Sequence, residues 1–378
     1  MKRYFRRIDK KLLLFTVLLF VLGLLMVFSS SSVAAFMRYK YSNPASFFIR
    51  QAIFMGFGAL FFLVAIRFST KSYGPLSWLG IIGLSVVLLL LLIYGTAIND
   101  SVSWIGYKGF GIQPSEFAKI LLIPFFASYY EMRSKKKDDL LTMIIPVGIG
   151  AIIAFLVLLQ NDFGTALIIA FVVFFMFCIA DVEPNLKKKI IIFGVIAVLS
   201  MGLVFAVFGK SRFQSKLERF DYLKPCEKFQ TSGNQVCNGY IAINNSNGIG
   251  KGLGNSTQKY LYLPESHTDF IYAILVEELG LIGVLILLTL YIIVLARIIN
   301  IGKNSYKNSH AMICYGVAFY IFIHIVVNLG GVLGLIPLTG VTLPFISYGG
   351  SFTISLIVGL TLVQRVKYET SLKESMKS

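Results

Sequence analysis

Long runs of apolar residues alternate with short polar segments along the whole chain. An α-helix needs about 20 apolar residues to cross the hydrocarbon core of a bilayer, and these runs approach that length. No run alternates apolar and polar residues with a period of two, as a membrane β-barrel requires. The pattern therefore predicts an all-α polytopic membrane protein with ten transmembrane helices, at residues 12–35, 48–66, 76–95, 115–130, 140–159, 165–181, 190–209, 269–296, 311–331 and 351–364.

The composition agrees with this fold class. Hydrophobic residues make up 56% of the 378 residues and charged residues only 14%, which is too little polar cover for a soluble protein of this length. The first apolar run follows a basic segment, as in a secretory signal peptide. The run is too long, however, and no soluble domain follows it. We therefore expect a retained first helix and a single membrane domain over residues 1–378.

The distribution of Lys and Arg predicts the orientation in the membrane, because cytoplasmic connections carry an excess of basic residues. Both termini are expected in the cytoplasm, with tails at 1–11 and about 365–378. A large extracytoplasmic loop, about 210–268, is expected between helices 7 and 8. The net charge of +17 reflects this topology rather than nucleic-acid binding, since no basic-aromatic folded module accompanies it. The basic clusters lie at 2–11, 67–71, 133–137, 187–189, 297–307 and 365–377.

Two of the four cysteines, Cys226 and Cys237, fall in the predicted extracytoplasmic loop. An oxidising exterior permits a disulfide between them. A structural zinc site would need four ligands, and only these two thiols are present in the loop. Cys178 and Cys314 fall inside predicted helices, where a lone cysteine usually packs as a small apolar residue.

The stretch LYLPESHTDFIYAILVEELG, residues 261–280, carries the strongest chemical signal. Glu265, His267 and Asp269 lie where a polar segment enters the predicted eighth helix, and Glu277 and Glu278 lie inside it. A carboxylate in hydrocarbon costs at least a few kcal/mol and is usually retained for a site or a packing role. Asp269 is the best candidate for a catalytic base.

Two further acidic residues, Glu116 and Asp162, fall on the predicted outer side. Glu116 lies three residues before Lys119, so the two side chains share one helical face. They form either an ion pair aimed into a protein cavity or an N-terminal cap next to a lysine that reaches the interface. Asp162, in the short connection QNDFGT, is either a helix cap or part of the wall of the same cavity.

The long loop contains the glycine-rich run GIGKGLGNS, residues 248–256. A nucleotide-binding P-loop is excluded, because Lys251 is followed by Gly252 rather than Ser or Thr and no strand precedes it. The backbone amides can instead cradle a diphosphate, with Lys251 or Lys259 adding charge. A flexible linker is the alternative.

Residues 332–351, VLGLIPLTGVTLPFISYGGS, contain two prolines and several glycines, which break any continuous helix. Broken backbone at membrane depth is tolerated only where protein or water satisfies it, so we expect a re-entrant element lining a cavity. His324 and Asn328, four residues apart in the helix before it, are expected to form interhelical hydrogen bonds. Together with Glu116, Asp162 and Asp269, this stretch predicts one outward-facing polar site.

The chain resembles the SEDS family (shape, elongation, division and sporulation) in four stretches that span nearly its whole length in order. Two positions depart from the family pattern: Ser103, where an arginine is common, and Asn161, where a proline is usual. The loss of the arginine removes a cation that would otherwise be available to the substrate. The four stretches are WIGYKGFGIQPSEFAK, QNDFGTA, GKGLGNSTQKYLYLPESHTDFIYAILVEELG and GLIPLTGVTLPFISYGGS.

The resemblance implies a peptidoglycan glycosyltransferase that polymerises lipid II, the undecaprenyl-diphosphate disaccharide-pentapeptide, with inversion and with an aspartate base. It implies that Asp269 is the catalytic residue and that Glu116 and Lys119 are important for activity. The form of the LPESHTDF motif favours the septal division branch over the elongation branch, and the sporulation branch stays an alternative. The full set of expected substrate-binding or supporting residues is Glu116, Lys119, Asp162, Lys251, Lys259, Glu265, His267 and Ser347.

The resemblance also implies a class B penicillin-binding protein as the transpeptidase partner, together with other divisome proteins. No cofactor is required by the sequence, although a divalent cation, Mg or Mn, is compatible with a departing diphosphate. Two alternatives come from other functional classes: a lipid II flippase and a non-catalytic scaffold. A flippase needs polar groups through the whole membrane depth, whereas here they concentrate on the predicted outer side.

Overall fold

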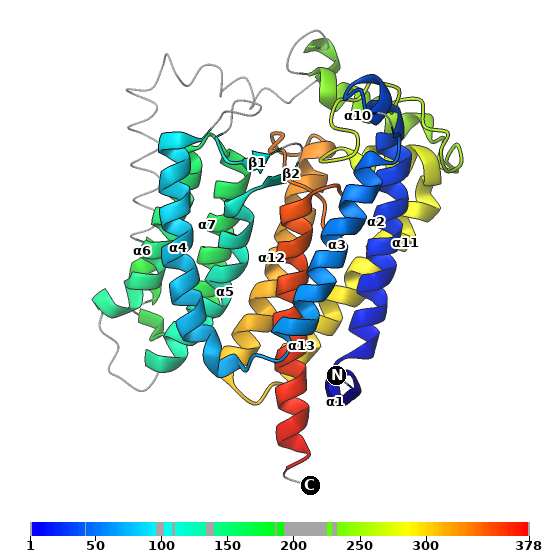
Figure 1. The fold of residues 1–378 in the computed structure, drawn as a ribbon. Coiled ribbons are helices and arrows are strands. Elements are labelled where there is room, and N and C mark those ends of the chain that lie inside the picture. The colour runs from blue at the N-terminus through cyan, green and yellow to red at the C-terminus, as the bar shows by residue number, and fades with distance from the viewer. Residues whose placement is uncertain are drawn as a thin grey trace.

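The computed structural model describes residues 2–41, 43–95, 102–107, 110–133, 140–185, 187–192, 225–228 and 233–376. Long helices run side by side to form one bundle (Figure 1). After the short α1 (Lys2–Arg7), these helices are α2 (Lys10–Met37), α3 (Ser46–Ala65), α4 (Tyr73–Tyr94), α5 (Pro114–Arg133), α6 (Leu140–Leu159), α7 (Phe163–Ile179), α11 (Ile271–Lys303), α12 (Asn308–Val332) and α13 (Gly350–Glu374).

The observed helices confirm the α-helical fold class. Each predicted helix has a counterpart in the described residues except the one at 190–209, most of which lies outside them. By length and apolar composition, five described helical segments suffice to cross a membrane: α2, α3, α4 with the 3-10 turn Thr70–Ser72 before it, α11 and α12. Together with the shorter apolar helices, these segments are those of a multi-pass membrane protein.

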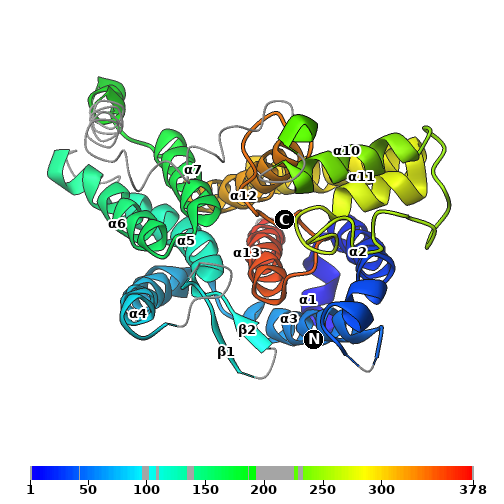
Figure 2. The same ribbon diagram turned by 90° about the horizontal axis from the view of Figure 1, so that it is seen from above.

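Helix α13 lies in the middle of the bundle when it is seen from above (Figure 2). It packs against α3, α5, α11 and α12. Close packing depends on small residues where the helices meet. A Cβ atom at Gly58 of α3 would lie 2.3 Å from Ile357 of α13, and one at Gly359 would lie 2.8 Å from Ile120 of α5. The centre is therefore closed by packed side chains.

The two ends of the bundle differ. Both chain termini lie at one end (Figure 1). At the other end lie the antiparallel hairpin of β1 (Ile105–Tyr107) and β2 (Phe110–Ile112), and the helix α10 (Asn234–Asn245), which packs on α11. A disulfide joins Cys237 of α10 to Cys226 in the 3-10 turn η3 (Pro225–Lys228). The candidate chemistry of the sequence also lies toward the end of the bundle that carries α10.

Helix α11 is broken at Gly280, whose φ of 61° and ψ of −157° are not helical. The glycine-rich loop, defined here as residues 246–260, supplies hydrogen bonds across the break. The amides of Lys251 and Gly252 donate to the carbonyls of Glu277 and Glu278 (both 2.9 Å), and Leu281 donates to Gly248 (2.9 Å). Because a Cβ at Gly250 would lie 2.5 Å from the amide nitrogen of Gly280, only glycine permits this approach.

The predicted break between the last two helices is confirmed. Residues 333–349, here called the broken segment, contain no helix or strand. Residues 333–340 are exposed or half-buried, whereas neighbouring helices enclose residues 341–347. There the hydroxyl of Tyr291 in α11 donates to the carbonyl of Pro344 (2.5 Å), and Gly23 of α2 packs against the backbone at Phe345. This is irregular backbone buried in protein, as the membrane environment requires. Its predicted place in a cavity wall stays a prediction.

Candidate active site

Asp269 lies in the turn that leads into α11, two residues before the first helical residue. Its side chain is buried, with 7% of the residue exposed. Within the part of the chain that the structure describes, its carboxylate forms no ion pair. Burial, and then the negative charge of Glu265, raise the pKa of Asp269 to about 7. A carboxylate with this pKa can accept a proton near neutral pH.

The hydroxyl of Thr268 lies between the two carboxylates of this turn. It is 2.8 Å from Oε2 of Glu265, 3.1 Å from the Glu265 carbonyl and 3.3 Å from Oδ1 of Asp269. A hydroxyl has one hydrogen to donate, and the shortest distance favours Glu265. Asp269 is thus left with the longest and weakest of the three contacts. Glu265 itself has a φ of +49°, which lies in the left-handed region of backbone conformation.

The broken segment and α12 hold this turn in place. The amide nitrogen of Asn328 donates to the carbonyls of Asp269 (2.8 Å) and Val341 (2.7 Å). The hydroxyl of Ser347 donates to the carbonyl of Thr268 (2.5 Å), and the amide of Tyr348 donates to the carbonyl of His267 (2.9 Å). Segments 59 and 79 residues away in the sequence therefore fix the backbone that carries Asp269.

Glu116 and Lys119 form an ion pair of 2.8 Å near the start of α5. Lys119 is only 1% exposed, so its side chain is enclosed by the protein. Its Nζ lies 3.2 Å from Nε2 of His324, whose Nδ1 lies 3.4 Å from the carbonyl of Thr342 in the broken segment. The pair is therefore part of an interhelical network rather than an isolated cap.

Asp162 takes one of its two predicted positions, the helix cap, while its place in a cavity wall stays a prediction. Its Oδ1 accepts from the amide of Thr165 (3.1 Å) and caps α7, while its Oδ2 accepts from the side chain of Gln113 (2.6 Å). The amide of Gln113 in turn donates to the hydroxyl of Ser351 in α13 (2.9 Å). Gln113 thereby links Asp162 to the first turn of α13, which follows the broken segment.

The two lysines of the glycine-rich loop are paired with carboxylates of α11. Lys251 forms an ion pair with Glu277 (3.0 Å), and Lys259 forms one with Glu278 (2.9 Å). Lys259 also donates to the carbonyl of Gly254 (2.5 Å) and lies 3.3 Å from the hydroxyl of Ser29. These contacts occupy the three hydrogens of its ammonium group.

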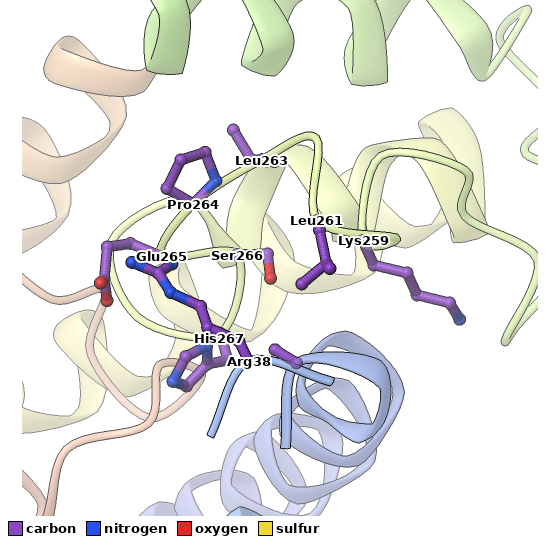
Figure 3. A pocket seen from close by; sticks show the side chains of 9 residues that line it. Arg38, Lys259, Leu261, Leu263, Pro264, Glu265, Ser266 and His267 are labelled. Carbon is purple, nitrogen blue, oxygen red and sulfur yellow. The ribbon is translucent and has the colours of Figure 1, made fainter. Parts of the chain in front are cut away.

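A cavity of about 280 Å³ lies beside the turn, between the end of α2 and residues 259–267 (Figure 3). Its polar lining includes Arg38, Glu265, Ser266 and His267. The His267 ring is buried against Phe47, with 4.5 Å between ring centroids. Burial lowers the pKa of His267 to about 4, so the ring is neutral at pH 7. Asp269 is not in the lining, although its neighbour Glu265 is.

Three groups around the site have no role in the sequence-based prediction: the Thr268 hydroxyl, the side chain of Gln113 and Arg38. Thr268 stands inside the LPESHTDF motif between two predicted site residues, and Gln113 directly precedes the predicted start of the PSEFAK helix. Their positions in these motifs are signals that sequence reasoning can use. Arg38 stands in a polar connection with no such context, and only the fold brings it to Glu265.

The chain matches the family profile described as "Cell cycle protein" (FTSW_RODA_SPOVE) over residues 10–372. It is 38% identical to the probable peptidoglycan glycosyltransferase FtsW of Bacillus subtilis, with 100% of this chain and 94% of that protein covered. It is 35% identical to the protein of the same name in Coxiella burnetii, with 96% of each covered. It is also 35% identical to the stage V sporulation protein E of Bacillus subtilis, with 95% and 96% covered.

Solved structures show the same architecture. A chain of a peptidoglycan synthase complex that coordinates polymerization and crosslinking matches with a TM-score of 0.75 at 25% identity, covering 96% of this chain and 98% of that one. The rod shape-determining protein RodA of Thermus thermophilus matches with a TM-score of 0.68 at 24% identity, covering 95% and 96%. At that identity the RodA match supports the fold alone.

Proposed function

This chain belongs to the FtsW, RodA and SpoVE family of cell cycle proteins, and we propose that it is a peptidoglycan glycosyltransferase that polymerises lipid II. The proposal is supported by relatives named peptidoglycan glycosyltransferase FtsW that align over its full length. The single observation that carries the mechanism is the buried Asp269 carboxylate, which has a pKa of about 7 and no cationic partner among the described residues.

In the proposed reaction, Asp269 accepts the proton of a sugar hydroxyl on one lipid-linked chain. The hydroxyl oxygen attacks the anomeric carbon of a second chain, and the bond between that carbon and the diphosphate breaks. The diphosphate leaves with the electron pair, so the attacking oxygen forms the new glycosidic bond and the anomeric configuration inverts. A single base suffices, because a diphosphate leaves without being protonated.

Supporting roles follow from the geometry around the base. Asn328 and Ser347 hold the backbone of its turn, while Glu116 and Lys119 connect α5 to the broken segment through His324. Asp162 connects the start of α7 to α13 through Gln113 and Ser351. Lys251 and Lys259 act through Glu277 and Glu278 to fix the glycine-rich loop on α11. Orientation of both substrates is the contribution expected from such a framework.

The charge on the departing diphosphate needs stabilisation, for which Mg or Mn is one candidate. No group of three or more His, Cys, Asp or Glu side chains gathers into a metal site within the described part of the chain. The ligand set of a dedicated protein site is therefore not found in those residues, and the mechanism proposed here contains no step through a metal ion.

We assign ten transmembrane helices, cytoplasmic termini, a large extracytoplasmic loop between helices 7 and 8, and an extracytoplasmic active site. The assignment is supported by the basic clusters and by the two termini lying at one end of the bundle (Figure 1). The partner would be a class B penicillin-binding protein, together with other divisome proteins at the septum. The division role is supported by the 38% identity to the FtsW of Bacillus subtilis, compared with 35% to its sporulation protein.

The test uses purified protein in liposomes with lipid II, with and without the transpeptidase partner. Wild-type protein is expected to form glycan chains, and Asp269→Ala is expected to form none while keeping its level and partner binding. Normal chain formation by Asp269→Ala would remove the base assignment. Transport of lipid II across the liposome membrane without chain formation would favour a flippase instead.

A further inference from the structure

Large apolar side chains lie on the outer surface of the glycine-rich loop and of the residues directly after it. Ile249 is 83% exposed and Leu253 is 54% exposed, and Tyr260 and Tyr262 are exposed as well. The two lysines of the loop, in contrast, are paired with carboxylates of α11. Isolated exposed apolar residues are common in proteins, but several of them on one short segment mark a surface that contacts a membrane or a partner.

The loop is joined to α11 at the break in this helix. The backbone of Ile249 packs against Gly280, and the amide of Leu281 donates to the carbonyl of Gly248 (2.9 Å). Leu281 and the next residue, Ile282, are exposed, and they belong to a helix that is apolar enough to cross a membrane. Seen from above, the segment that follows α10 reaches the outer edge of the bundle, away from α13 at its centre (Figure 2). The exposed side chains of the loop therefore continue the surface that α11 presents to lipid.

The position of the break relative to the bilayer follows from the length of α11 after it. Residues 281–303 form a helix about 34 Å long at a rise of about 1.5 Å per residue, which exceeds the hydrocarbon thickness of about 30 Å. Arg297 and Lys303 mark the headgroup region at one end of this helix. Counting about 20 residues back from them gives roughly residues 277–283. The break at Gly280 therefore lies at the opposite edge of the hydrocarbon core, and so does the loop that packs on it.

We propose that the glycine-rich loop is inserted in the membrane. Ile249 and Leu253 contact lipid acyl chains at this edge of the hydrocarbon core, and Tyr260 and Tyr262 lie at the level of the headgroups. Tyrosine suits that level because its ring is apolar and its hydroxyl is polar. The ion pairs of the two lysines lower the cost of charged groups at this depth. Neither a diphosphate cradle nor a flexible linker requires exposed apolar side chains at these positions. The inference goes beyond the proposed function and does not depend on it.

The test measures how deep single positions of the loop lie in the bilayer. A nitroxide label is attached to Ile249→Cys or Leu253→Cys in proteoliposomes of phosphatidylglycerol and phosphatidylethanolamine. Electron paramagnetic resonance then measures its collisions with oxygen and with a water-soluble nickel complex. Oxygen concentrates in hydrocarbon, which excludes the nickel complex, so we expect an oxygen-to-nickel collision ratio about 10-fold higher than at the control Asn255→Cys. Asn255 is an exposed polar residue of the same loop.

Two further features of the design make the comparison specific. Ile292→Cys, at an exposed position of α11, gives the reference ratio for full contact with lipid. All variants carry Cys178→Ala and Cys314→Ala, which remove the two free thiols. Labelling without reductant keeps the disulfide between Cys226 and Cys237 intact.

Three results would overturn the proposal. Equal ratios in Ile249→Cys, Leu253→Cys and Asn255→Cys would place the loop in water. Weak collisions with both reagents at a large excess of lipid would show that protein, such as a second copy of this chain, covers the loop. Loss of the oxygen preference when the transpeptidase partner is added would identify a protein interface instead. Ile249→Trp is a second probe that needs no label: we expect lipids with brominated acyl chains to quench its added fluorescence, and quenching no greater than that of wild type would contradict the insertion.

Discussion

Glu116 and Asp269 are both buried carboxylates near the same end of the bundle, but their surroundings differ. Glu116 is 6% exposed and is paired with Lys119 at 2.8 Å, and this lysine also contacts His324. Asp269 is 7% exposed and has no cation among the described residues; its nearest side-chain donor is the Thr268 hydroxyl at 3.3 Å. The two sites thus share burial and differ in charge compensation.

Under the proposed mechanism, this difference separates a structural carboxylate, Glu116, from the proposed base, Asp269. A buried ion pair is costly to form, but removing one partner is worse because it leaves an unpaired charge. The charged form of Glu116 therefore depends on Lys119, which also contacts His324 of α12. Asp269 has no such partner, so burial destabilises its charged form and makes it a better proton acceptor.

The largest expected effect comes from Asp269→Asn, which keeps the shape of the side chain and removes its basicity. We expect the rate of glycan chain formation to fall about 10²- to 10⁴-fold, the usual contribution of a general base. Thermal stability is expected to be equal or higher above pH 7, because no uncompensated charge remains. If Asp269→Asn lost stability but kept full activity, Asp269 would be a structural carboxylate rather than the base. The measurements are lipid II polymerisation and thermal unfolding in detergent.

Lys119→Met is expected to leave Glu116 buried without its cation. By analogy with other buried pairs, this should destabilise the protein by about 3–5 kcal/mol. The double variant Glu116→Gln with Lys119→Met removes both charges and is expected to recover part of the loss. Thermal unfolding of the two variants measures the effect. Equal stability of Lys119→Met and wild type would show that the pair is not structural.

The wild-type pH profile tests the pKa of Asp269 directly. Because the base must be ionised and its pKa is raised to about 7, activity is expected to fall about 10-fold per pH unit below pH 7 and to level off above it. Activity falls at low pH because the carboxylate of Asp269 becomes protonated and can then no longer accept a proton. The measurement is the initial polymerisation rate between pH 5 and pH 9. A profile that stays flat down to pH 5 would contradict the raised pKa.

Glu265→Gln is expected to have the smallest effect, a shift of the acid limb to lower pH. The substitution removes the neighbouring negative charge that raises the pKa of Asp269, while burial, the larger cause, remains. The shifted pKa should therefore stay above the ordinary value for aspartate. Ser266→Ala is the matched control, because Ser266 lines the same cavity and donates to the carbonyl of Ser30 rather than to this turn. Equal shifts in both variants would remove the assignment to Glu265.

The sequence predicted the helices and the principal candidate residues for physical reasons. Apolar runs of membrane length can satisfy their backbone only as helices, so the described helices overlap the predicted ranges. Two of them extend further than predicted: α11 continues to Lys303 rather than 296, and α13 to Glu374 rather than 364. Residues 332–351 contain prolines and glycines that cannot continue a helix, and a break occurs there. The spacing of Glu116 and Lys119 placed them on one face, where they form an ion pair.

Contacts between distant segments were decided only by the tertiary structure. The pairing of Lys251 and Lys259 with Glu277 and Glu278, and the position of Arg38 beside Glu265, depend on how loops fold over helix ends, which local sequence does not specify. The pKa of Asp269 also depends on the tertiary structure. The sequence shows that residue 269 is an acid, but burial and neighbouring charges set its strength as a base, and both exist only in the folded protein.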